Sequence, residues 1–246
     1  LNGNDRYLAT ADAALGSAVA GVGILIDKRG DDVYVGANLT QGSGFGGVGI
    51  VWDGSGNDLY LGQVAAQASS FYGVGLLIDD SGNDFYSAWQ VAQGFGGSGG
   101  IALLHDRAGN DFYLADEKIP SLYARPNEFS GWAQGVGCGF RGFTPGGIGM
   151  LVDWRGHDQY RGGDFSQGSG YFFGVGLVFD GEGEDEYRGG RYAQGAAAHQ
   201  AIGVAVDAGG NDTYSATVAA SQGSGWDASI GVLEDLSGAD RYRGGT

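Results

Sequence analysis

Several residue types that define common protein classes are scarce in this sequence. The single cysteine, Cys138, excludes an internal disulfide framework and says little about the cellular compartment. No run of 18 apolar residues occurs, so no transmembrane helix is expected. Lysine is present only at Lys28 and Lys118, and the net charge is −16. Binding to nucleic acid through a basic surface is therefore not expected.

Glycine, in contrast, is abundant, with 52 residues against three prolines. The glycines have no three-residue period, which excludes collagen. Disorder is not expected either, because 42% of the residues are hydrophobic and the aromatic residues recur at regular intervals. The composition therefore indicates a folded chain with an internal repeat.

The repeat is the motif Asp-x-x-Gly-x-Asp-x-Tyr, which occurs eight times. Its first aspartates are Asp27, Asp53, Asp79, Asp106, Asp153, Asp180, Asp207 and Asp235. Its second aspartates are Asp32, Asp58, Asp84, Asp111, Asp158, Asp185, Asp212 and Asp240. Its tyrosines are Tyr34, Tyr60, Tyr86, Tyr113, Tyr160, Tyr187, Tyr214 and Tyr242. A glutamine follows each tyrosine except Tyr242, usually by seven residues, as Gln41 follows Tyr34.

The tyrosines define a unit of about 27 residues. Neighbouring tyrosines are 26 to 28 residues apart, except for Tyr113 and Tyr160, which are 47 apart. The longer gap indicates one unit plus an insertion of about 20 residues within residues 114–146. We predict a single repeat domain over residues 1–246. Because the chain starts and stops inside repeats, we expect a segment of a longer or processed protein, or ends that stack on partners.

A short β-prone run precedes each first aspartate and predicts a strand. The run contains consecutive aliphatic residues, such as Ile24 and Leu25. Because adjacent residues of a strand point to opposite faces, both faces are expected to be covered. One face would line the core, and the other would contact a second layer of the same coil or a neighbouring molecule.

Three short extended segments per unit suit one coil of a parallel β-solenoid with about eight to nine coils. In this all-β fold, tyrosine rings would stack on their copies, and glutamine side chains would hydrogen-bond to the copies above and below. The alternative is a chain of β-hairpins that forms a meander or a barrel. The aliphatic runs do not alternate as a lipid-facing barrel requires, which favours the solenoid.

The aspartate turns resemble the calcium-binding nonapeptide of RTX proteins, Gly-Gly-x-Gly-x-Asp-x-(apolar)-x. The resemblance lies in residues 53–60, Asp-Gly-Ser-Gly-Asn-Asp-Leu-Tyr, and in residues 81–86 and 209–214. It covers about nine residues of each unit, whereas RTX arrays repeat the nonapeptide back to back. The resemblance implies a related turn and Ca²⁺ bound between coils, as in the secreted proteins of that family.

Stacked coils would also place like carboxylates about 5 Å apart, where each pair repels by roughly 3 kcal/mol at an effective dielectric constant of 20. All sixteen motif aspartates are therefore candidate Ca²⁺ ligands, since Ca²⁺ takes six to eight oxygen ligands. Two arrangements need no metal. The carboxylates could accept hydrogen bonds from turn N–H groups, or they could splay into water.

No catalytic constellation is evident. His105, His157 and His199 occupy three different phases of the repeat. We therefore expect a non-enzymatic structural or interaction module, either a rigid extracellular or cell-surface scaffold or a self-assembling subunit. Its partners would be copies of itself or other proteins, bound through the chain ends or the outer aliphatic face. The alternative is a carbohydrate-binding or carbohydrate-active β-helix, with a site near residues 114–146 that includes Trp132.

Overall fold

The aliphatic run before each first aspartate forms the longest strand of its repeat in the computed structural model, which describes residues 2–123 and 126–245. In each of these strands, alternate residues point into the coil and out of it. In β6 (Val48–Asp53), for example, Val51 is buried whereas Ile50 is partly exposed. The long strands are β3 (Val22–Ile26), β6, β9 (Val74–Asp79), β11 (Ile101–Asp106), β15 (Ile148–Val152), β19 (Val175–Asp180), β22 (Ile202–Asp207) and β25 (Ile230–Asp235).

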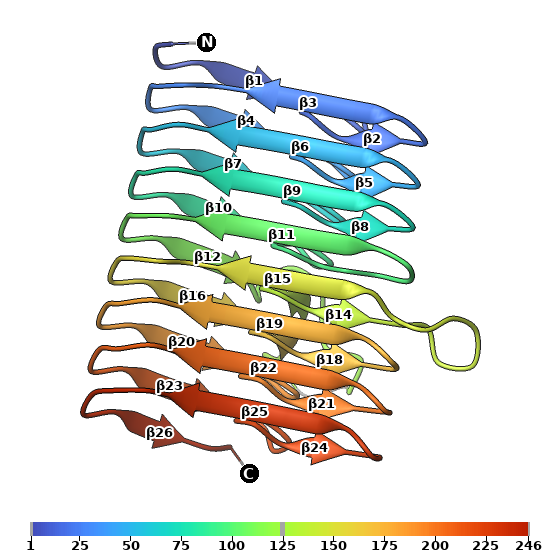
Figure 1. Ribbon diagram of the computed structural model, residues 1–246, viewed down its shortest axis with the longest axis vertical. Helices are drawn as coiled ribbons and strands as arrows, with labels where there is room; N and C mark the ends of the chain where they lie inside the picture. The colour runs from blue at the N-terminus through green and yellow to red at the C-terminus, as the bar shows by residue number, and fades with distance from the viewer. Residues whose placement is uncertain (1, 124–125, 246) are drawn as a thin grey trace.

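These strands form one eight-stranded parallel sheet in which each strand pairs with its copies in the adjacent coils (Figure 1). Equivalent residues are directly opposite, as Val51 is to Leu77. The hairpin alternative is excluded, because the strands of successive units are parallel and in register. The predicted solenoid is therefore confirmed.

The tyrosine of each repeat lies in a second, nine-stranded parallel sheet. The truncated first copy contributes its edge strand, so that Tyr7 pairs with Tyr34. The strands are β1 (Arg6–Leu8), β4 (Val33–Val35), β7 (Leu59–Leu61), β10 (Phe85–Ser87), β12 (Phe112–Ala115), β16 (Gln159–Gly162), β20 (Glu186–Gly189), β23 (Thr213–Ala216) and β26 (Arg241–Arg243).

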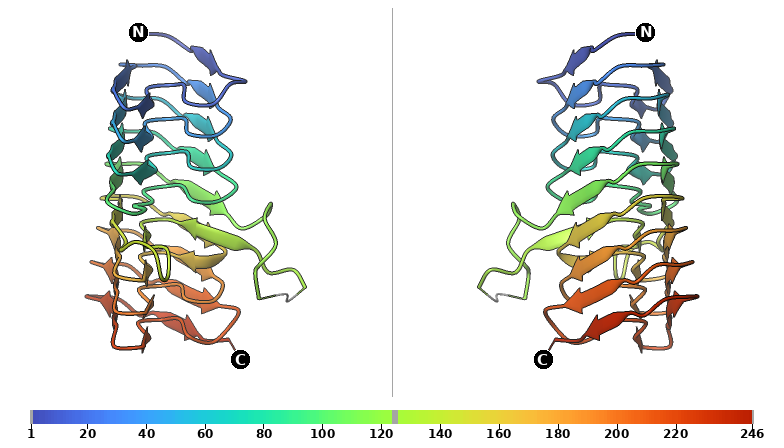
Figure 2. Two further views of the ribbon diagram at one scale, coloured as in Figure 1. Left: turned by 90° about the vertical axis from the view of Figure 1, so that its right-hand side faces the viewer. Right: turned by 90° about the vertical axis from the view of Figure 1, so that its left-hand side faces the viewer.

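The third side of the coil consists of very short strands (Figure 2). They form a three-stranded, a four-stranded and a two-stranded sheet. The first contains β2 (Ala18–Val19), β5 (Gly44–Phe45) and β8 (Ser70–Phe71). The second contains β14 (Gly137–Cys138), β18 (Gly170–Tyr171), β21 (Ala197–Ala198) and β24 (Gly225–Trp226). The third contains β13 (Ser130–Ala133) and β17 (Asp164–Ser166). Within the described residues, no helix is long and apolar enough to cross a membrane.

The tyrosines form a continuous stack inside the rod, as predicted. The ring centroids of Tyr60 and Tyr86 are 4.8 Å apart, and the ring planes differ by 5°. The rings pack against the inward aliphatic side chains of the long strands, among them Leu77 and Leu104. From Tyr34 to Tyr214 the rings are buried, and this column is the core of the solenoid.

The predicted pairing between glutamine side chains is wrong. The Nε2 of Gln67 donates to the backbone carbonyls of Tyr60, at 2.9 Å, and of Ser87 in the next coil, also at 2.9 Å. Gln67 adopts a left-handed conformation with φ 53°. This backbone conformation directs the side chain into the coil, where it connects two coils through main-chain carbonyls.

The extra residues of the fifth unit leave the coil at two points. Gln134 follows Tyr113 by 21 residues, whereas Gln41 follows Tyr34 by seven. The first loop therefore lies between β12 and β13, and its described residues, 116–123 and 126–129, project from the coil (Figure 2). The second, residues 139–147, lies between β14 and β15 (Figure 1). Within the predicted domain and insertion, residues 1, 124–125 and 246 are outside the described part of the chain.

Candidate metal centre

The two aspartates of each motif meet at the corner between the long strand and the tyrosine strand. The first aspartate ends the long strand in the inward phase, and the second precedes the tyrosine strand by one residue. Asp53 is 0% exposed and Asp58 is 2% exposed. The arrangement in which the carboxylates splay into water is therefore excluded for the interior coils.

The first aspartate has hydrogen-bond donors for both of its oxygens in the coils from Asp27 to Asp153 and at Asp207, whereas Oδ1 of Asp180 has no partner. The Tyr60 hydroxyl donates to Oδ2 of Asp79 in the next coil, at 2.7 Å. The backbone N–H of Ser81 donates to Oδ1 of the same carboxyl group, at 3.1 Å. This second contact is the turn hydrogen bond expected for an aspartate at the start of a turn.

The second aspartate has a donor for only one oxygen. The backbone N–H of Asp58 donates to Oδ1 of Asp84 in the next coil, at 2.6 Å. Oδ2 of Asp84 is buried and has no hydrogen-bond partner. The same orphaned oxygen occurs in Asp32, Asp58, Asp111, Asp158, Asp185 and Asp212. A buried polar atom without a partner normally carries a substantial free-energy penalty, so a repeated column of them requires an explanation.

Carboxylate oxygens from two successive coils converge beside these orphaned atoms. One oxygen from each of Asp58, Asp79 and Asp84 lies within 4.8 Å of the other two. Equivalent groups are Asp5–Asp27–Asp32, Asp32–Asp53–Asp58, Asp84–Asp106–Asp111 and Asp111–Asp153–Asp158. Neighbouring groups share a second aspartate and thus form a continuous column. These buried clusters could hold metal ions.

The interior raises the pKa values of the second aspartates strongly. Burial, followed by the charges of Asp79 and Asp106, raises the pKa of Asp84 to about 10. Burial and the neighbouring carboxylates likewise raise the pKa of Asp111 to about 11. Each group therefore needs either a proton or a nearby positive charge at neutral pH.

The structure brings both predicted ladders together in one column. Of the sixteen candidate ligands, the fourteen from Asp27 to Asp212 are buried, and only Asp235 and Asp240 in the last coil are partly exposed. The sequence did not reveal the tyrosine hydroxyl as a partner of the first aspartate, because that contact crosses between coils. Asp5 of the truncated copy also joins the column.

The three histidines lie apart and have separate partners. His105 accepts a hydrogen bond from the Trp154 indole, at 2.9 Å, and His157 accepts one from the backbone N–H of Glu184, at 2.7 Å. His199 pairs with Asp227, at 2.7 Å. Each histidine thus has a different local partner.

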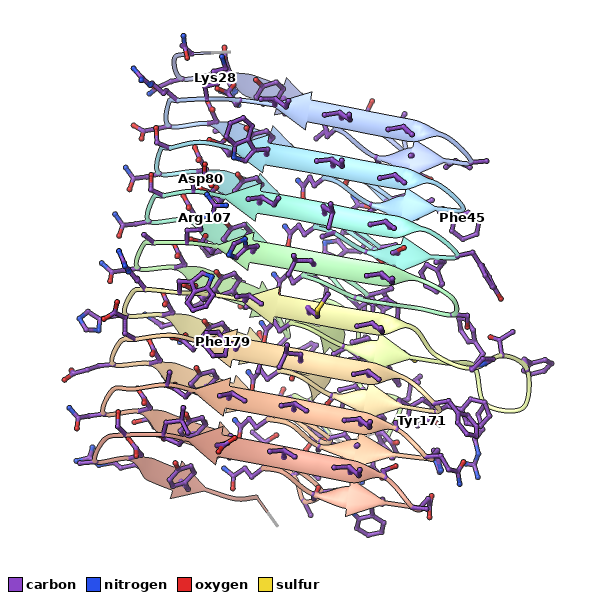
Figure 3. The ribbon with its side chains drawn as sticks, viewed as in Figure 1. Lys28, Phe45, Asp80, Arg107, Tyr171 and Phe179 are labelled. Carbon is purple, nitrogen blue, oxygen red and sulfur yellow. The ribbon has the colours of Figure 1, made fainter. Side chains whose placement is uncertain are left out.

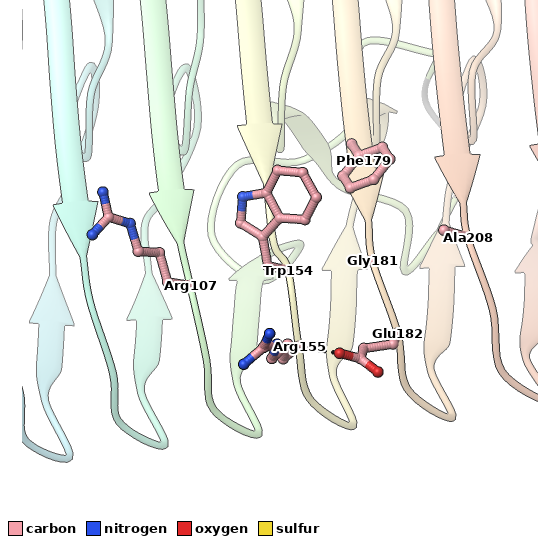
Figure 4. Close-up of a pocket in the computed structure, with 7 residues that line it drawn as sticks. All are labelled: Arg107, Trp154, Arg155, Phe179, Gly181, Glu182 and Ala208. Atoms are coloured by element: carbon pink, nitrogen blue, oxygen red, sulfur yellow. Dashed lines mark ion pairs between the residues drawn. The ribbon is translucent and has the colours of Figure 1, made fainter.

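A shallow groove lies at the outer corner of the coils, beside the aspartate turns (Figure 4). Its volume is about 420 Å³, and its lining includes Trp154 and Phe179, whose rings meet edge to face. Arg107 and Arg155 flank the two rings, and Arg155 pairs with Glu182 at 3.2 Å.

Trp132, the aromatic residue expected at a carbohydrate site near the insertion, does not line this groove. The ring of Trp132 stacks on Phe165 with a centroid distance of 3.8 Å and packs in a small apolar cluster under the third side.

Comparison of this chain with protein-family models, with curated proteins and with solved structures finds no match.

Proposed function

We propose that this chain is a non-enzymatic structural module, a rigid β-solenoid scaffold that is stabilised by Ca²⁺ in its aspartate column. The observation that carries the proposal is the row of buried Oδ2 atoms without hydrogen-bond partners, each beside two further carboxylates. A cation next to each orphaned oxygen would supply the missing interaction.

The chemistry of the donor set favours a hard cation. All candidate ligands in the column are carboxylate oxygens, which suit Ca²⁺ or Mg²⁺ rather than metals that prefer nitrogen or sulfur. Each coil contributes two aspartates, so one divalent ion per coil would balance the charge. Ca²⁺ fits best, because its coordination geometry is flexible and the RTX resemblance of the turns points to the same ion.

An extracellular or cell-surface location agrees with this proposal. Calcium sites of extracellular modules have dissociation constants of about 10⁻⁴ to 10⁻³ M. The stacked rings and the hydrogen bonds between coils give a stiff rod, which suits a spacer or a scaffold.

The test compares Asp84→Asn with the wild type in metal-free buffer and in millimolar Ca²⁺. An asparagine keeps the acceptor for the Asp58 N–H and replaces the orphaned oxygen with a donor. We expect the variant to be at least as stable as the wild type without metal, and to gain less from Ca²⁺ in scanning calorimetry.

Asp31→Asn is the matched control, because Asp31 is exposed in an equivalent turn. It should respond to Ca²⁺ like the wild type. A wild-type melting temperature that is the same in Ca²⁺ and in metal-free buffer would refute the calcium proposal.

Carbohydrate binding is the second candidate function, favoured by the groove at Trp154. An exposed indole beside arginine and glutamate side chains can stack on a sugar ring and hydrogen-bond to its hydroxyl groups. We expect Trp154→Ala to abolish glycan-array signals and Trp226→Ala, an equally exposed indole elsewhere, to retain them. An array without wild-type signals would remove this candidate.

A further inference from the structure

The outward side of the eight-stranded sheet is a broad apolar face. Three columns of side chains cover it, one from each outward position of the long strands. The first column is Val22, Val48, Val74, Ile101, Ile148, Val175, Ile202 and Ile230. The second is Ile24, Ile50, Leu76, Leu103, Met150, Leu177, Val204 and Val232. The third is Ile26, Trp52, Ile78, His105, Val152, Phe179, Val206 and Glu234.

Side chains on this face are accessible to solvent. Ile101 is 45% exposed, and the face is open in Figure 3, where Phe179 marks one edge and the turns with Asp80 and Arg107 lie beyond it. Only His105 and Glu234 interrupt the apolar columns. Exposed apolar patches larger than a few hundred Å² typically mark interaction surfaces.

The outward side of the nine-stranded sheet shows which residues an exposed strand face of this coil can carry. Its outward positions include Arg161, Glu186 and Arg188, so the coil tolerates charges on an exposed strand face. Strand propensity alone would also admit threonine, yet the three columns contain none. The folding of the coil therefore does not account for the aliphatic character of the long-strand face.

We propose that this face packs against the same face of a second copy of the chain. The eight strands, about 4.8 Å apart, and six residues of about 3.3 Å each define a face of roughly 700 Å². Two copies would bury about 1,400 Å², which is within the range of about 1,200–2,000 Å² for stable interfaces.

Charge supports this choice of partner. Each copy carries a net charge of −16, so two copies repel one another unless their acidic regions stay apart. The aspartates of the column lie inside the coil, and the outer face contributes only Glu234 as an acidic group. Packing through this face brings the two molecules together where they carry the least charge.

A face of regularly repeated columns can also pack on a copy of itself. Its columns repeat at the spacing between strands, so the ridges of one copy can lie in the furrows of the other about a two-fold axis. The result is a sheet sandwich with layers about 10 Å apart. This inference goes beyond the scaffold and calcium proposals and requires neither.

Sedimentation velocity of the whole chain over about 1–100 μM tests the proposal. We expect a dimer, and we expect Leu76→Lys with Leu103→Lys to raise its dissociation constant at least about 100-fold. The control is Leu59→Lys with Leu61→Lys, at outward positions of the nine-stranded sheet, which should leave the dissociation constant within about threefold.

The milder pair Leu76→Thr with Leu103→Thr keeps strand propensity and should also weaken the dimer if the lysine variant fails to fold. All samples are measured in Ca²⁺ and in metal-free buffer, so that a loss of the dimer is distinguishable from a loss of metal binding. A wild-type monomer at the highest concentration overturns the proposal, whether or not the protein then binds lipid vesicles or another protein. Equal weakening by the control pair would overturn it as well.

Discussion

At the scale of single residues, the motif side chains of the interior coils have hydrogen-bond partners in another coil. The hydroxyl of Tyr86 donates to Asp106 in the following coil, at 2.7 Å, and the N–H of Asp84 donates to Asp111, at 2.6 Å. In the interior coils the fixed Asp-x-Tyr spacing therefore serves contacts between units, whereas Tyr242 in the last coil donates to Asp235 of its own motif. Interior stability depends on these repeated contacts.

Removing one tyrosine hydroxyl should destabilise the protein. Tyr86→Phe preserves the stacked ring but leaves one oxygen of the buried Asp106 without its donor. We expect the free energy of unfolding to fall by about 1–3 kcal/mol in urea denaturation. Tyr72→Phe, at a side chain that is 60% exposed, should change it by less than about 0.5 kcal/mol.

The pH dependence follows from the second aspartates. Burial, with the neighbouring carboxylates, raises the pKa of Asp84 to about 10 and of Asp158 to about 9. In the unfolded chain their pKa is about 3.9. Between these values the folded state retains protons that the unfolded state releases, so the free energy of unfolding falls as the pH rises.

We therefore expect the melting temperature in metal-free buffer to fall between about pH 5 and pH 9, by about 2–4 °C per pH unit for each protonated aspartate. Ca²⁺ replaces these protons and should reduce the slope. Calorimetry across this pH range measures both effects. A melting temperature that rises with pH in metal-free buffer would contradict the account.

At the scale of the elements, the sequence predicted the strands, the tyrosine stack and the two aspartate ladders, because identical offsets in every unit mean identical places in every coil. It did not predict the direction of the Gln67 side chain, which depends on a left-handed backbone conformation at that residue. Nor did it divide the insertion into two loops, since only the strands β13 and β14, which lie between the loops, locate them.

The aspartate turn depends on the absence of a side chain at its glycine. A Cβ at Gly82 would overlap the carbonyl oxygen of Gly56 in the preceding coil and crowd the Asp84 carboxylate. Gly82→Ala should lower the free energy of unfolding by about 1–3 kcal/mol in urea denaturation. At Gly21 a Cβ makes only ordinary contact, so Gly21→Ala should be close to neutral, and equal losses in the two variants would contradict this explanation.

At the scale of the whole molecule, the solenoid is a stack in which each coil contacts only its neighbours. Deletion of residues 54–79 removes one period and joins Asp53 to Asp80, which restores the turn sequence. We expect a folded protein with an unchanged circular dichroism signal per residue and a slightly lower melting temperature. Deletion of residues 54–72 breaks the period and should prevent folding, and similar behaviour of both variants would contradict a nearest-neighbour stack.

Because the units stack in parallel and in register, the number of units sets the length of the rod. Each added unit lengthens the rod by one strand spacing of about 4.8 Å and keeps equivalent residues in register. Duplication or loss of a unit would therefore alter the length of the rod and leave the strand register unchanged. Gain or loss of one repeat unit in the gene would change the distance between two domains attached to the ends of the rod by one strand spacing.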